Sequence, residues 1–322
     1  MEYGKVPGIE KPVSRLVQGT VMVTSKDLSG SFALLDAVWE QGCNTFDTAA
    51  VYGMGDCERT VGRWIAERGI REKVVLIGKG AHPDGSRNRV TPADITADLY
   101  ESLERFKTDR IDLYLLHRDD PSAPVGPIVE ALNEHRRAGR ICAFGGSNWT
   151  HERIGEANEY AATRGLTGFA ASSPNFSLAE QVKAPWAGCL SVGGAQGEAA
   201  REWYRRKKLS VFAWSSLAGG FFSGRFRRDN LASFNGYFEK LCVKCYCVER
   251  NFQRFDRAAE LAREKGLSVA QVALAYVMNQ PLNLFALVGC ASGAEMKQDV
   301  EALDVKLTAR ELAWLDLRSD QR

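Results

Sequence analysis

The sequence has little of what marks a membrane-embedded, secreted or nucleic-acid-binding protein. No apolar run approaches the ~18 residues of a membrane span. The first residues, Met1–Lys5, lack the basic segment followed by an apolar segment that a signal peptide requires. The 42 Lys and Arg residues nearly balance the 40 Asp and Glu residues, so the net charge of +2 gives no basic surface for nucleic acid. We therefore expect a cytoplasmic protein that binds neither membrane nor nucleic acid.

The composition also excludes a disordered chain and a disulfide scaffold. Of the 322 residues, 45% are apolar and 25% are charged, the usual balance of a globular protein. The eight cysteines belong to a long chain without a secretion signal, so we expect them to be reduced. Cys242, Cys245 and Cys247 form a C-x2-C-x-C cluster, but zinc normally takes four ligands and no His or further Cys lies close in sequence. We expect incidental thiols and no metal, with a metal site as the less favoured alternative.

Short strand-like runs alternate with helix-like segments along the chain. The runs typical of buried strands are Leu16–Thr20, Cys43–Asp47, Val74–Lys79, Ile111–His117, Ile141–Gly145, Phe169–Ser173, Ser210–Trp214 and Ala286–Gly289. The segments with helical periodicity are Ser31–Gln41, Cys57–Arg68, Thr91–Phe106, Pro127–Ala138, Thr150–Arg164, Glu198–Lys207, Asn251–Lys265 and Ser268–Asn279. Strands that alternate with helices predict an α/β protein with a parallel sheet.

The glycine pattern G-x-G-x-x-G, which a doubly wound dinucleotide-binding sheet carries after its first strand, is also absent. The sequence therefore favours a closed (β/α)8 TIM barrel, a single domain over residues 1–322, with its active site at the carboxyl ends of the strands. One long irregular region, Gly219–Arg250, follows the seventh predicted strand. Loops of that length in a compact domain are usually functional, so we expect residues 219–250 to form a cofactor or active-site loop.

Four ionisable residues lie at or just beyond the ends of predicted strands. Asp47 ends the second strand, and Tyr52 follows it. Lys79 ends the third strand and His117 ends the fourth. In a barrel all four positions share one rim. Each residue alone has an ordinary structural explanation, such as a turn cap or packing, but their occurrence at one rim favours an active site.

These residues lie within segments that resemble the aldo-keto reductase family. The run Asn44–Gly53 (NTFDTAAVYG) is similar to the signature of that family. Further matching segments follow in order along the chain: Ile77–Lys79, Asp109–His117, Gly139–Ile141, Gly146–Trp149 and Trp214–Gly220. The resemblance implies a (β/α)8 barrel enzyme that transfers hydride between a nicotinamide cofactor, NADP or NAD, and the carbonyl of an aldehyde, ketone or sugar-like substrate.

The resemblance implies that Asp47, Tyr52, Lys79 and His117 are the catalytic residues. Tyr52 is expected to donate a proton to the carbonyl oxygen, which requires a phenol whose pKa lies closer to the working pH. A neighbouring ammonium lowers the pKa of a phenol, and Lys79 is expected to supply it while Asp47 holds Lys79 in place. His117 is expected to hydrogen-bond the carbonyl oxygen and to orient the substrate.

The same resemblance implies a set of cofactor contacts. Ser147 and Asn148 match residues that hold the nicotinamide carboxamide, and Trp214 stands where an aromatic ring stacks on the nicotinamide. Ser173 stands where the family usually has a Gln, so that contact is expected to be weaker. The other expected cofactor contacts are Thr20, Asp47, Ser215, Ser216, Leu217, Gly219, Gly224, Arg225, Gly289, Ala291, Glu295 and Asp299.

The residues after the eighth predicted strand leave the choice between NADP and NAD open. Family members that prefer NADP place Lys or Arg in this region, whereas here Glu295 and Asp299 fall near those positions. A phosphate with roughly two negative charges is disfavoured beside carboxylates. Lys297, Arg225 or Arg227 could compensate. The family favours NADP, and the local sequence favours NAD.

A small-molecule substrate is expected at the rim. The expected substrate-binding residues are Tyr52, His117, Arg118, Asp119 and Trp149. A mixture of carboxylates and indoles suits a sugar or polyol carbonyl. Asp119 and Asp120 fit equally well as a turn before Pro121.

One alternative function belongs to another class. The same resemblance extends to the β subunits of voltage-gated potassium channels, which share the barrel and would make this chain a cofactor-binding regulatory subunit. All four catalytic positions are intact, and no channel-docking segment is recognisable. The sequence therefore favours the enzyme.

Overall fold

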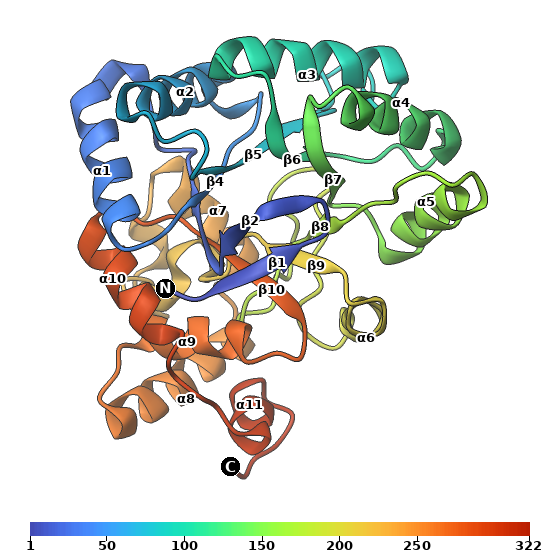
Figure 1. The fold of residues 1–322 in the computed structure, drawn as a ribbon. Helices are drawn as coiled ribbons and strands as arrows, with labels where there is room; N and C mark the ends of the chain where they lie inside the picture. The colour runs from blue at the N-terminus through green and yellow to red at the C-terminus, as the bar shows by residue number, and fades with distance from the viewer.

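Eight parallel strands form a closed barrel (Figure 1). The structure is a computed structural model that describes all residues from 1 to 322. In the order in which they pair, the strands are β3 (Leu16–Gly19), β4 (Thr45–Asp47), β5 (Val75–Gly80), β6 (Ile111–Leu116), β7 (Ile141–Ser147), β8 (Ala171–Ser173), β9 (Ser210–Ala213) and β10 (Asn283–Val288). Pairing between β10 and β3 closes the ring. The predicted TIM barrel is confirmed.

Helices surround the barrel, and several begin at a side-chain cap. The eight that the sequence predicted are α1 (Leu28–Glu40), α2 (Asp56–Arg68), α3 (Pro92–Phe106), α4 (Val125–Arg137), α5 (His151–Thr163), α6 (Glu198–Lys207), α8 (Glu249–Lys265) and α9 (Val269–Met278). In α3, the Thr91 hydroxyl accepts a hydrogen bond from the Asp94 amide at 3.2 Å, and Pro92 occupies the first turn. Its buried stripe, which includes Ile95 and Leu99, packs toward the barrel.

An antiparallel hairpin that the sequence analysis missed precedes the barrel. Its strands are β1 (Tyr3–Val6) and β2 (Ile9–Ser14). Val6, Ile9 and Val13 are buried in one cluster with strand residues of the barrel interior. Gly8, in the turn, has φ of 88°, and a Cβ there would lie 2.9 Å from the carbonyl oxygen of Cys142 near the start of β7. The hairpin therefore covers the amino-terminal end of the barrel and leaves the carboxyl ends of the strands as its mouth.

The region Gly219–Arg250 is not one irregular loop, so that part of the prediction is wrong. It includes most of a 3-10 helix, η3 (Ala218–Ser223), a second one, η4 (Leu231–Ser233), and the helix α7 (Tyr237–Tyr246). Cys242, Cys245 and Tyr246 are the buried residues of α7, at helical spacing. Helix α7 packs on η3, where the Cys242 thiol lies 3.5 Å from the carbonyl oxygen of Ala218. The clustered cysteines thus belong to a helix interface, and all eight cysteines are free thiols.

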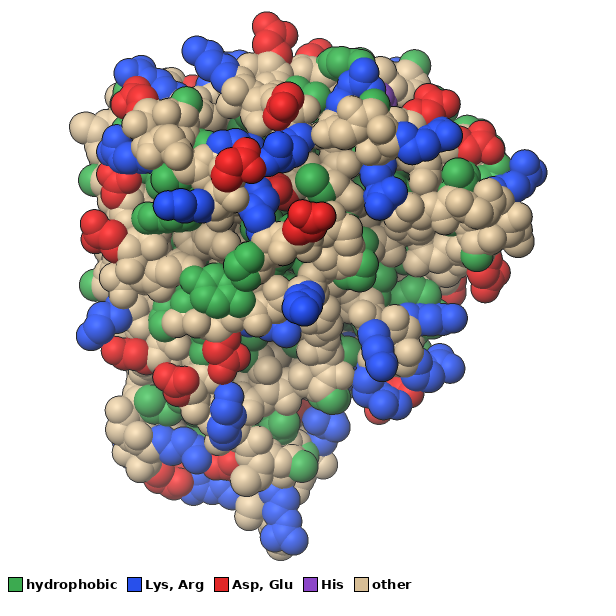
Figure 2. Space-filling view, in the orientation of Figure 1, with side chains coloured by type: hydrophobic (Ala, Val, Ile, Leu, Met, Phe, Trp, Pro, Cys, Tyr) green, Lys and Arg blue, Asp and Glu red, His purple; other side chains and the backbone are tan.

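The remaining unpredicted elements lie near the carboxyl terminus. Helix α10 (Gly293–Ala302) follows β10, and α11 (Ala309–Leu315) ends the fold. A second long irregular stretch, residues 174–197, connects β8 to α6. No helix combines the length and the apolar character needed to cross a membrane. On the face of the molecule that Figure 2 shows, basic and acidic side chains are interspersed.

The pairing register brings the strand ends to one rim. Asp47 pairs with Gly19 on one side and Ile77 on the other. Ser147 at the end of β7 pairs with Ser173 at the end of β8. Because all eight strands are parallel, these residues end on the same side of the barrel, opposite the hairpin.

Candidate active site

Asp47, Lys79 and Tyr52 form a hydrogen-bonded cluster at the mouth of the barrel. The Lys79 Nζ atom lies 2.5 Å from Asp47 Oδ1 and 3.5 Å from the Tyr52 hydroxyl, and it donates to the carbonyl oxygen of Thr48 at 2.9 Å. Lys79 and Asp47 are 3% and 2% exposed. Tyr52 is only half-buried, because it lies in the turn after β4. The ammonium is thus held inside the barrel with the phenol at its outer side.

His117 lies beside this cluster. Its ring stands edge-on to the Tyr52 ring, with the centroids 5.9 Å apart. Its side chain is buried, and its Nδ1 atom has no hydrogen-bond partner in the protein. The Asn148 amide donates to the carbonyl oxygen of His117 at 3.3 Å, which fixes the end of β6. The structure thus brings all four expected catalytic residues together.

Burial sets the protonation states in the site. Burial raises the pKa of the Tyr52 phenol above its ordinary value, although Lys79 acts in the opposite direction. Lys79 thus acts on this pKa in the expected direction, but burial and the Asp47 charge outweigh the ammonium. Burial also lowers the pKa of His117 well below its ordinary value, and Lys79 acts in the same direction. At neutral pH, Tyr52 is a protonated phenol and His117 is a neutral imidazole.

Lys79 keeps its charge in this environment. Burial acts to lower the pKa of Lys79, but the Asp47 charge and the contacts with Asp47 and Tyr52 outweigh burial and raise that pKa above its ordinary value. An ammonium held against a carboxylate and a phenol can stabilise a phenolate. The site therefore combines a proton donor, a fixed cation and a neutral hydrogen-bonding ring.

The residues expected at the nicotinamide lie beside His117. The Ser147 hydroxyl donates to the carbonyl oxygen of Ser173 at 3.0 Å, and Asn148 Oδ1 accepts from Trp214 Nε1 at 3.2 Å. The Ser173 hydroxyl is buried and has no partner in the protein, as is typical of a polar group that binds a ligand. Asn148 itself has φ of 62°, an uncommon conformation that concentrates at functional sites. Among these residues, the Ser173 hydroxyl is the polar group that the protein leaves without a partner for the edge of a nicotinamide.

Two further expected contacts use their hydroxyl groups within the protein. The Thr20 hydroxyl donates to the carbonyl oxygen of Asp47 at 3.0 Å, and the Ser216 hydroxyl donates to that of Ala213 at 2.8 Å. Both residues are fully buried. They stabilise the strand ends, and the structure gives no free hydroxyl at either position.

The segment after β9 has an unusual backbone. Ser215, Ala218, Gly219, Gly220 and Gly224 all have φ between 53° and 89°. Such residues turn successive backbone amides toward one side and form anion-binding hollows. A Cβ on Gly219 would meet nothing closer than 3.9 Å, and the nearest atom to one on Gly220 would be 4.0 Å away. The segment, which also includes the half-buried Leu217, therefore offers open backbone that suits a dinucleotide phosphate.

The segment after β10 adds a second open surface. A Cβ on Gly289 would have no atom within 4 Å. Glu295 lies in the first turn of α10, where its Oε2 atom accepts from the Ala291 amide at 2.8 Å. Asp299 is 6% exposed, with the Cys290 thiol 3.2 Å from its Oδ2 atom. Burial raises the pKa of Asp299 to about 6, and Glu295 acts in the same direction.

The cations proposed to compensate these carboxylates already have partners. Lys297 lies 3.3 Å from Glu301, one helical turn further along α10. Arg225 lies 3.1 Å from Glu239 of α7, and Arg227 lies 3.3 Å from Asp229. Because these pairs are exposed, each holds its cation only weakly.

Three of the expected substrate-binding side chains bind other groups of the protein instead. Arg118 is buried and donates to the carbonyl oxygens of His117 at 2.8 Å and Ala187 at 3.1 Å. Asp119 pairs with Arg153 at 3.2 Å. Trp149 is fully buried and donates through Nε1 to the carbonyl oxygen of Arg118 at 3.1 Å. These side chains hold the loops together, so the structure leaves Tyr52 and His117 as the expected substrate contacts that face the mouth.

The turn interpretation of the same loop agrees with the structure. Asp120 Oδ1 accepts from the Ser122 amide at 3.0 Å, directly around Pro121. The carboxylates after His117 therefore shape the loop. Arg118, Asp119 and Trp149 therefore give no support for a sugar-like substrate.

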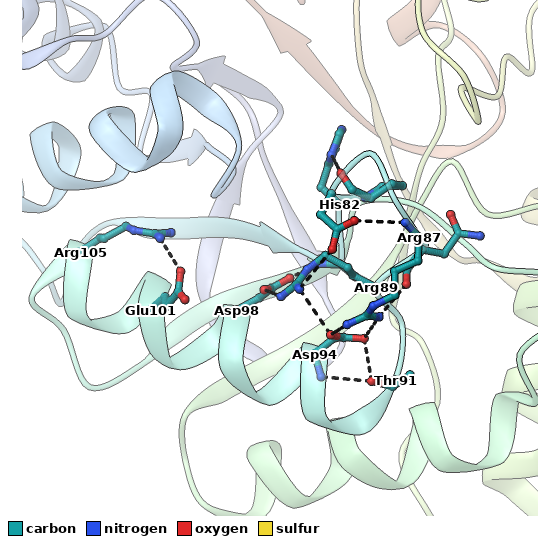
Figure 3. Close-up of polar contacts among 12 residues, drawn as sticks. His82, Arg87, Arg89, Thr91, Asp94, Asp98, Glu101 and Arg105 are labelled. Atoms are coloured by element: carbon teal, nitrogen blue, oxygen red, sulfur yellow. Dashed lines mark hydrogen bonds and ion pairs between the residues drawn. The ribbon is translucent and has the colours of Figure 1, made fainter.

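His82, which is not among the expected site residues, also lies at the mouth, beside His117. The two ring centroids are 5.1 Å apart. His82 is half-buried and comes three residues after Lys79, in the loop between β5 and α3 (Figure 3). Its place beyond a strand end was a usable signal, since a barrel assembles its site from such loops.

Most of the exposed large apolar side chains also lie in the segments that follow strand ends. They are Val21, Met22, Val51, Met54, Val182, Trp186, Tyr237 and Phe238, of which the last two are the first residues of α7. Trp186 and Tyr237 are joined by a hydrogen bond of 2.7 Å between the indole nitrogen and the phenol oxygen. The mouth side of the barrel therefore presents apolar surface around its polar centre.

Comparison with known proteins agrees with this geometry. The sequence profile of the Aldo/keto reductase family matches residues 15–317. An uncharacterized oxidoreductase of Bacillus subtilis, YrpG, is 29% identical over 98% of this chain and 95% of its own length. A probable voltage-gated potassium channel subunit beta of Oryza sativa is 26% identical over 95% of this chain and 92% of its own.

A solved structure shows the same fold. The thermostable aldo-keto reductase Tm1743, crystallised with the inhibitor epalrestat, superposes with a TM-score of 0.74 over 99% of this chain and all of its own, at 18% identity. The family profile spans nearly the whole barrel, including every strand from β3 to β10. This chain belongs to the aldo/keto reductase family, and it is an oxidoreductase whose family supports a nicotinamide cofactor and a small carbonyl substrate.

Proposed function

We propose that this chain is an NAD(P)H-dependent carbonyl reductase in which Tyr52 is the proton donor. The observation that supports this most is the position of Lys79 Nζ, 2.5 Å from Asp47 Oδ1 and 3.5 Å from the Tyr52 hydroxyl. A buried ammonium needs a carboxylate partner, and here that pair also touches a phenol at the barrel mouth. A purely structural ion pair would not need the phenol.

The chain's residues would act on the carbonyl oxygen. The nicotinamide, when bound, supplies the hydride that the carbonyl carbon receives. Tyr52 donates its hydroxyl proton to the oxygen, and Lys79 stabilises the phenolate that remains. Neutral His117 donates a hydrogen bond to the same oxygen and fixes its direction. Asp47 keeps the ammonium in contact with Tyr52.

The cofactor-binding residues would divide into two groups. Ser147, Asn148, Ser173 and Trp214 would hold the nicotinamide end, beside His117. The segment Ser215–Gly224, with its five residues of positive φ, and the open backbone at Gly289 would hold the phosphates. The unpaired Ser173 hydroxyl and the open glycines support this assignment.

We propose further that NADH is usable and that preference for NADPH is weak. Glu295 lies in the first turn of α10, and Asp299 is buried one turn below it. Two carboxylates near the expected 2′-phosphate position disfavour an added phosphate. Arg225 and Lys297 have acidic partners, which reduces their ability to compensate.

Replacement of Tyr52 by Phe tests the proton donor. Tyr52→Phe should lower kcat for aldehyde reduction by at least ~100-fold, the lower end for general acid catalysis, with the Kd for the cofactor unchanged. Tyr100→Phe, an exposed tyrosine on α3, is the matched control and should keep full activity. A Tyr52→Phe enzyme within a few-fold of wild type rejects the assignment.

The same assay separates the enzyme from a regulatory subunit. A channel-type subunit is the second candidate because a relative bears that name. A regulatory subunit would bind the cofactor tightly and turn over poorly with every aldehyde tested. Multiple turnovers with NADH or NADPH would favour the reductase.

A further inference from the structure

The loop between β5 and α3 presents a second histidine to the mouth of the barrel. His82 lies edge-on to His117, with the ring centroids 5.1 Å apart and the planes at 68°. His117 in turn lies edge-on to Tyr52, at 5.9 Å. The three rings therefore form a row, and His117 lies between the proposed proton donor and His82.

An ionic network of α3 fixes the backbone that carries His82 (Figure 3). Ala81, the residue before it, has φ of 58°, and its amide donates to Asp98 Oδ2 at 2.7 Å. Arg89 binds the other oxygen of Asp98 at 2.5 Å. A left-handed alanine is strained, and such strain concentrates at functional sites. The network thus holds the backbone next to His82 in a strained conformation.

Asp94 anchors the far side of the same loop. Arg87 binds both oxygens of Asp94, at 2.6 and 2.7 Å. The Thr91 hydroxyl donates to Asp94 as well, at 2.7 Å. Because Asp94 and Asp98 lie one turn apart on α3, the helix holds the loop at two points. None of these contacts involves the His82 ring, so the anchoring does not explain why a histidine stands there.

The His82 ring has a defined tautomer. Its Nδ1 atom lies 2.9 Å from the carbonyl oxygen of Pro83, which can only accept, so Nδ1 carries the hydrogen. Burial lowers the pKa of His82, and Arg118 acts in the same direction, so the ring is neutral at pH 7. Its Nε2 atom is then an acceptor, and it has no hydrogen-bond partner in the protein.

We propose that His82 determines specificity by accepting a hydrogen bond from a hydroxyl group on the carbon next to the substrate carbonyl. This inference rests on the proposed function, because His117 must donate to the carbonyl oxygen. A 2-hydroxy aldehyde or ketone carries a carbonyl oxygen, which accepts hydrogen bonds, and a hydroxyl group, which donates one, on adjacent carbons. His117 can donate to the carbonyl oxygen while the neighbouring His82 accepts from the hydroxyl group. The apolar surface around the mouth suits a short apolar substituent on the same substrate.

Two aldehydes that differ by one hydroxyl group test the inference. The kcat/KM for 2-hydroxypropanal and for propanal is measured for wild type, His82→Phe and His82→Leu with the better cofactor. The Phe and Leu side chains both lack the acceptor nitrogen of His82 but differ in size. A decrease in kcat/KM that both variants share therefore reports the lost hydrogen bond. The kcat/KM for 2-hydroxypropanal should fall about tenfold in both variants, the scale of one hydrogen bond, while that for propanal stays within twofold. His151→Phe, at the start of α5, is the matched control and should change neither value.

The propanal rate also shows that each variant is folded and binds cofactor. A ratio of the two kcat/KM values that changes by less than threefold in either variant overturns the role of His82, while leaving the proposed function intact. An equal decrease in kcat/KM for both aldehydes likewise overturns the role of His82. A wild-type protein that reduces neither aldehyde with either cofactor refutes the proposed function, and this inference with it.

Discussion

Asp299 is a buried carboxyl whose ionisation should destabilise the folded protein. It is 6% exposed, it contacts the Cys290 thiol, and no cation binds it. Burial raises its pKa from the ordinary 3.8 to about 6. Because the folded state binds the proton more tightly, the contribution to stability is fully present below about pH 4 and is lost as the pH rises through about 6. At ~1.4 kcal/mol per pH unit, ionisation at pH 8 costs the folded state about 3 kcal/mol.

Replacement of Asp299 by Asn should therefore stabilise the protein more at pH 8 than at pH 4.5. Asn keeps the shape and an oxygen acceptor for the Cys290 thiol, and it cannot ionise. The free energy of unfolding is measured by urea titration at both pH values, with a reductant because all eight cysteines are free. The free energy of unfolding of Asp299→Asn, relative to that of wild type, should increase by about 1–3 kcal/mol between pH 4.5 and pH 8.

A matched substitution controls for general effects of charge. Asp304, just beyond α10, is exposed, and Asp304→Asn should give the same difference from wild type at both pH values. An Asp299→Asn protein whose advantage does not depend on pH would refute the reasoning. An equal pH dependence in Asp304→Asn would assign the effect to net charge.

Three further predictions concern the site. Lys79→Met should nearly abolish turnover and shift the alkaline limb of the remaining pH profile upward, since Lys79 is the main group that opposes burial in setting the pKa of Tyr52. High activity with an unchanged profile would show that the ammonium does not act on Tyr52. Glu295→Arg should strengthen binding of NADPH by ~1–3 kcal/mol, the scale of a charge-assisted hydrogen bond, and leave the affinity for NADH nearly unchanged in a fluorescence titration. An equal effect on both affinities, or a wild-type preference for NADPH of about a thousandfold, would place Glu295 away from the 2′ position. Amide hydrogen exchange in residues 219–250 should slow when a saturating nucleotide is added; identical exchange would mean that this region does not close on the cofactor.

The clustering of Asp47, Tyr52, Lys79 and His117 was predictable because it depends on local rules. Asp47, Lys79 and His117 each end, or directly follow, a buried strand, and parallel strands in a closed barrel share one rim. A strand of four to six buried residues is visible as an apolar run, so the rim positions follow from the sequence. Tyr52 follows in the adjacent turn.

The expected substrate residues that turn away from the mouth do so because of tertiary contacts. Trp149 and Asp119 follow strand ends too, but Trp149 donates to a backbone carbonyl and Asp119 pairs with Arg153 of α5. No local pattern distinguishes a side chain that turns inward from one that faces the mouth. His82 is the opposite case, because its position depends on Asp98, a residue of the following helix.

The missed elements have weak patterns for a similar reason. Strand β2 contains Pro12 and alternates poorly, and only contact with the barrel interior makes it a strand. Helix α7 mixes aromatic, basic and cysteine residues, so its buried face is visible only once η3 is placed against it.

The pairing between β3 and β10 has a consequence for synthesis of the chain. Strand β3 comes from the start of the sequence and β10 from near its end, and Arg15, beside β3, also binds Asn283 at 2.7 Å. While the ribosome is still making α8 and α9, both β3 and β9 have an unpaired edge. Barrel closure must therefore wait until translation is nearly complete, and a nascent chain stalled before β10 should be a substrate for chaperones and proteases.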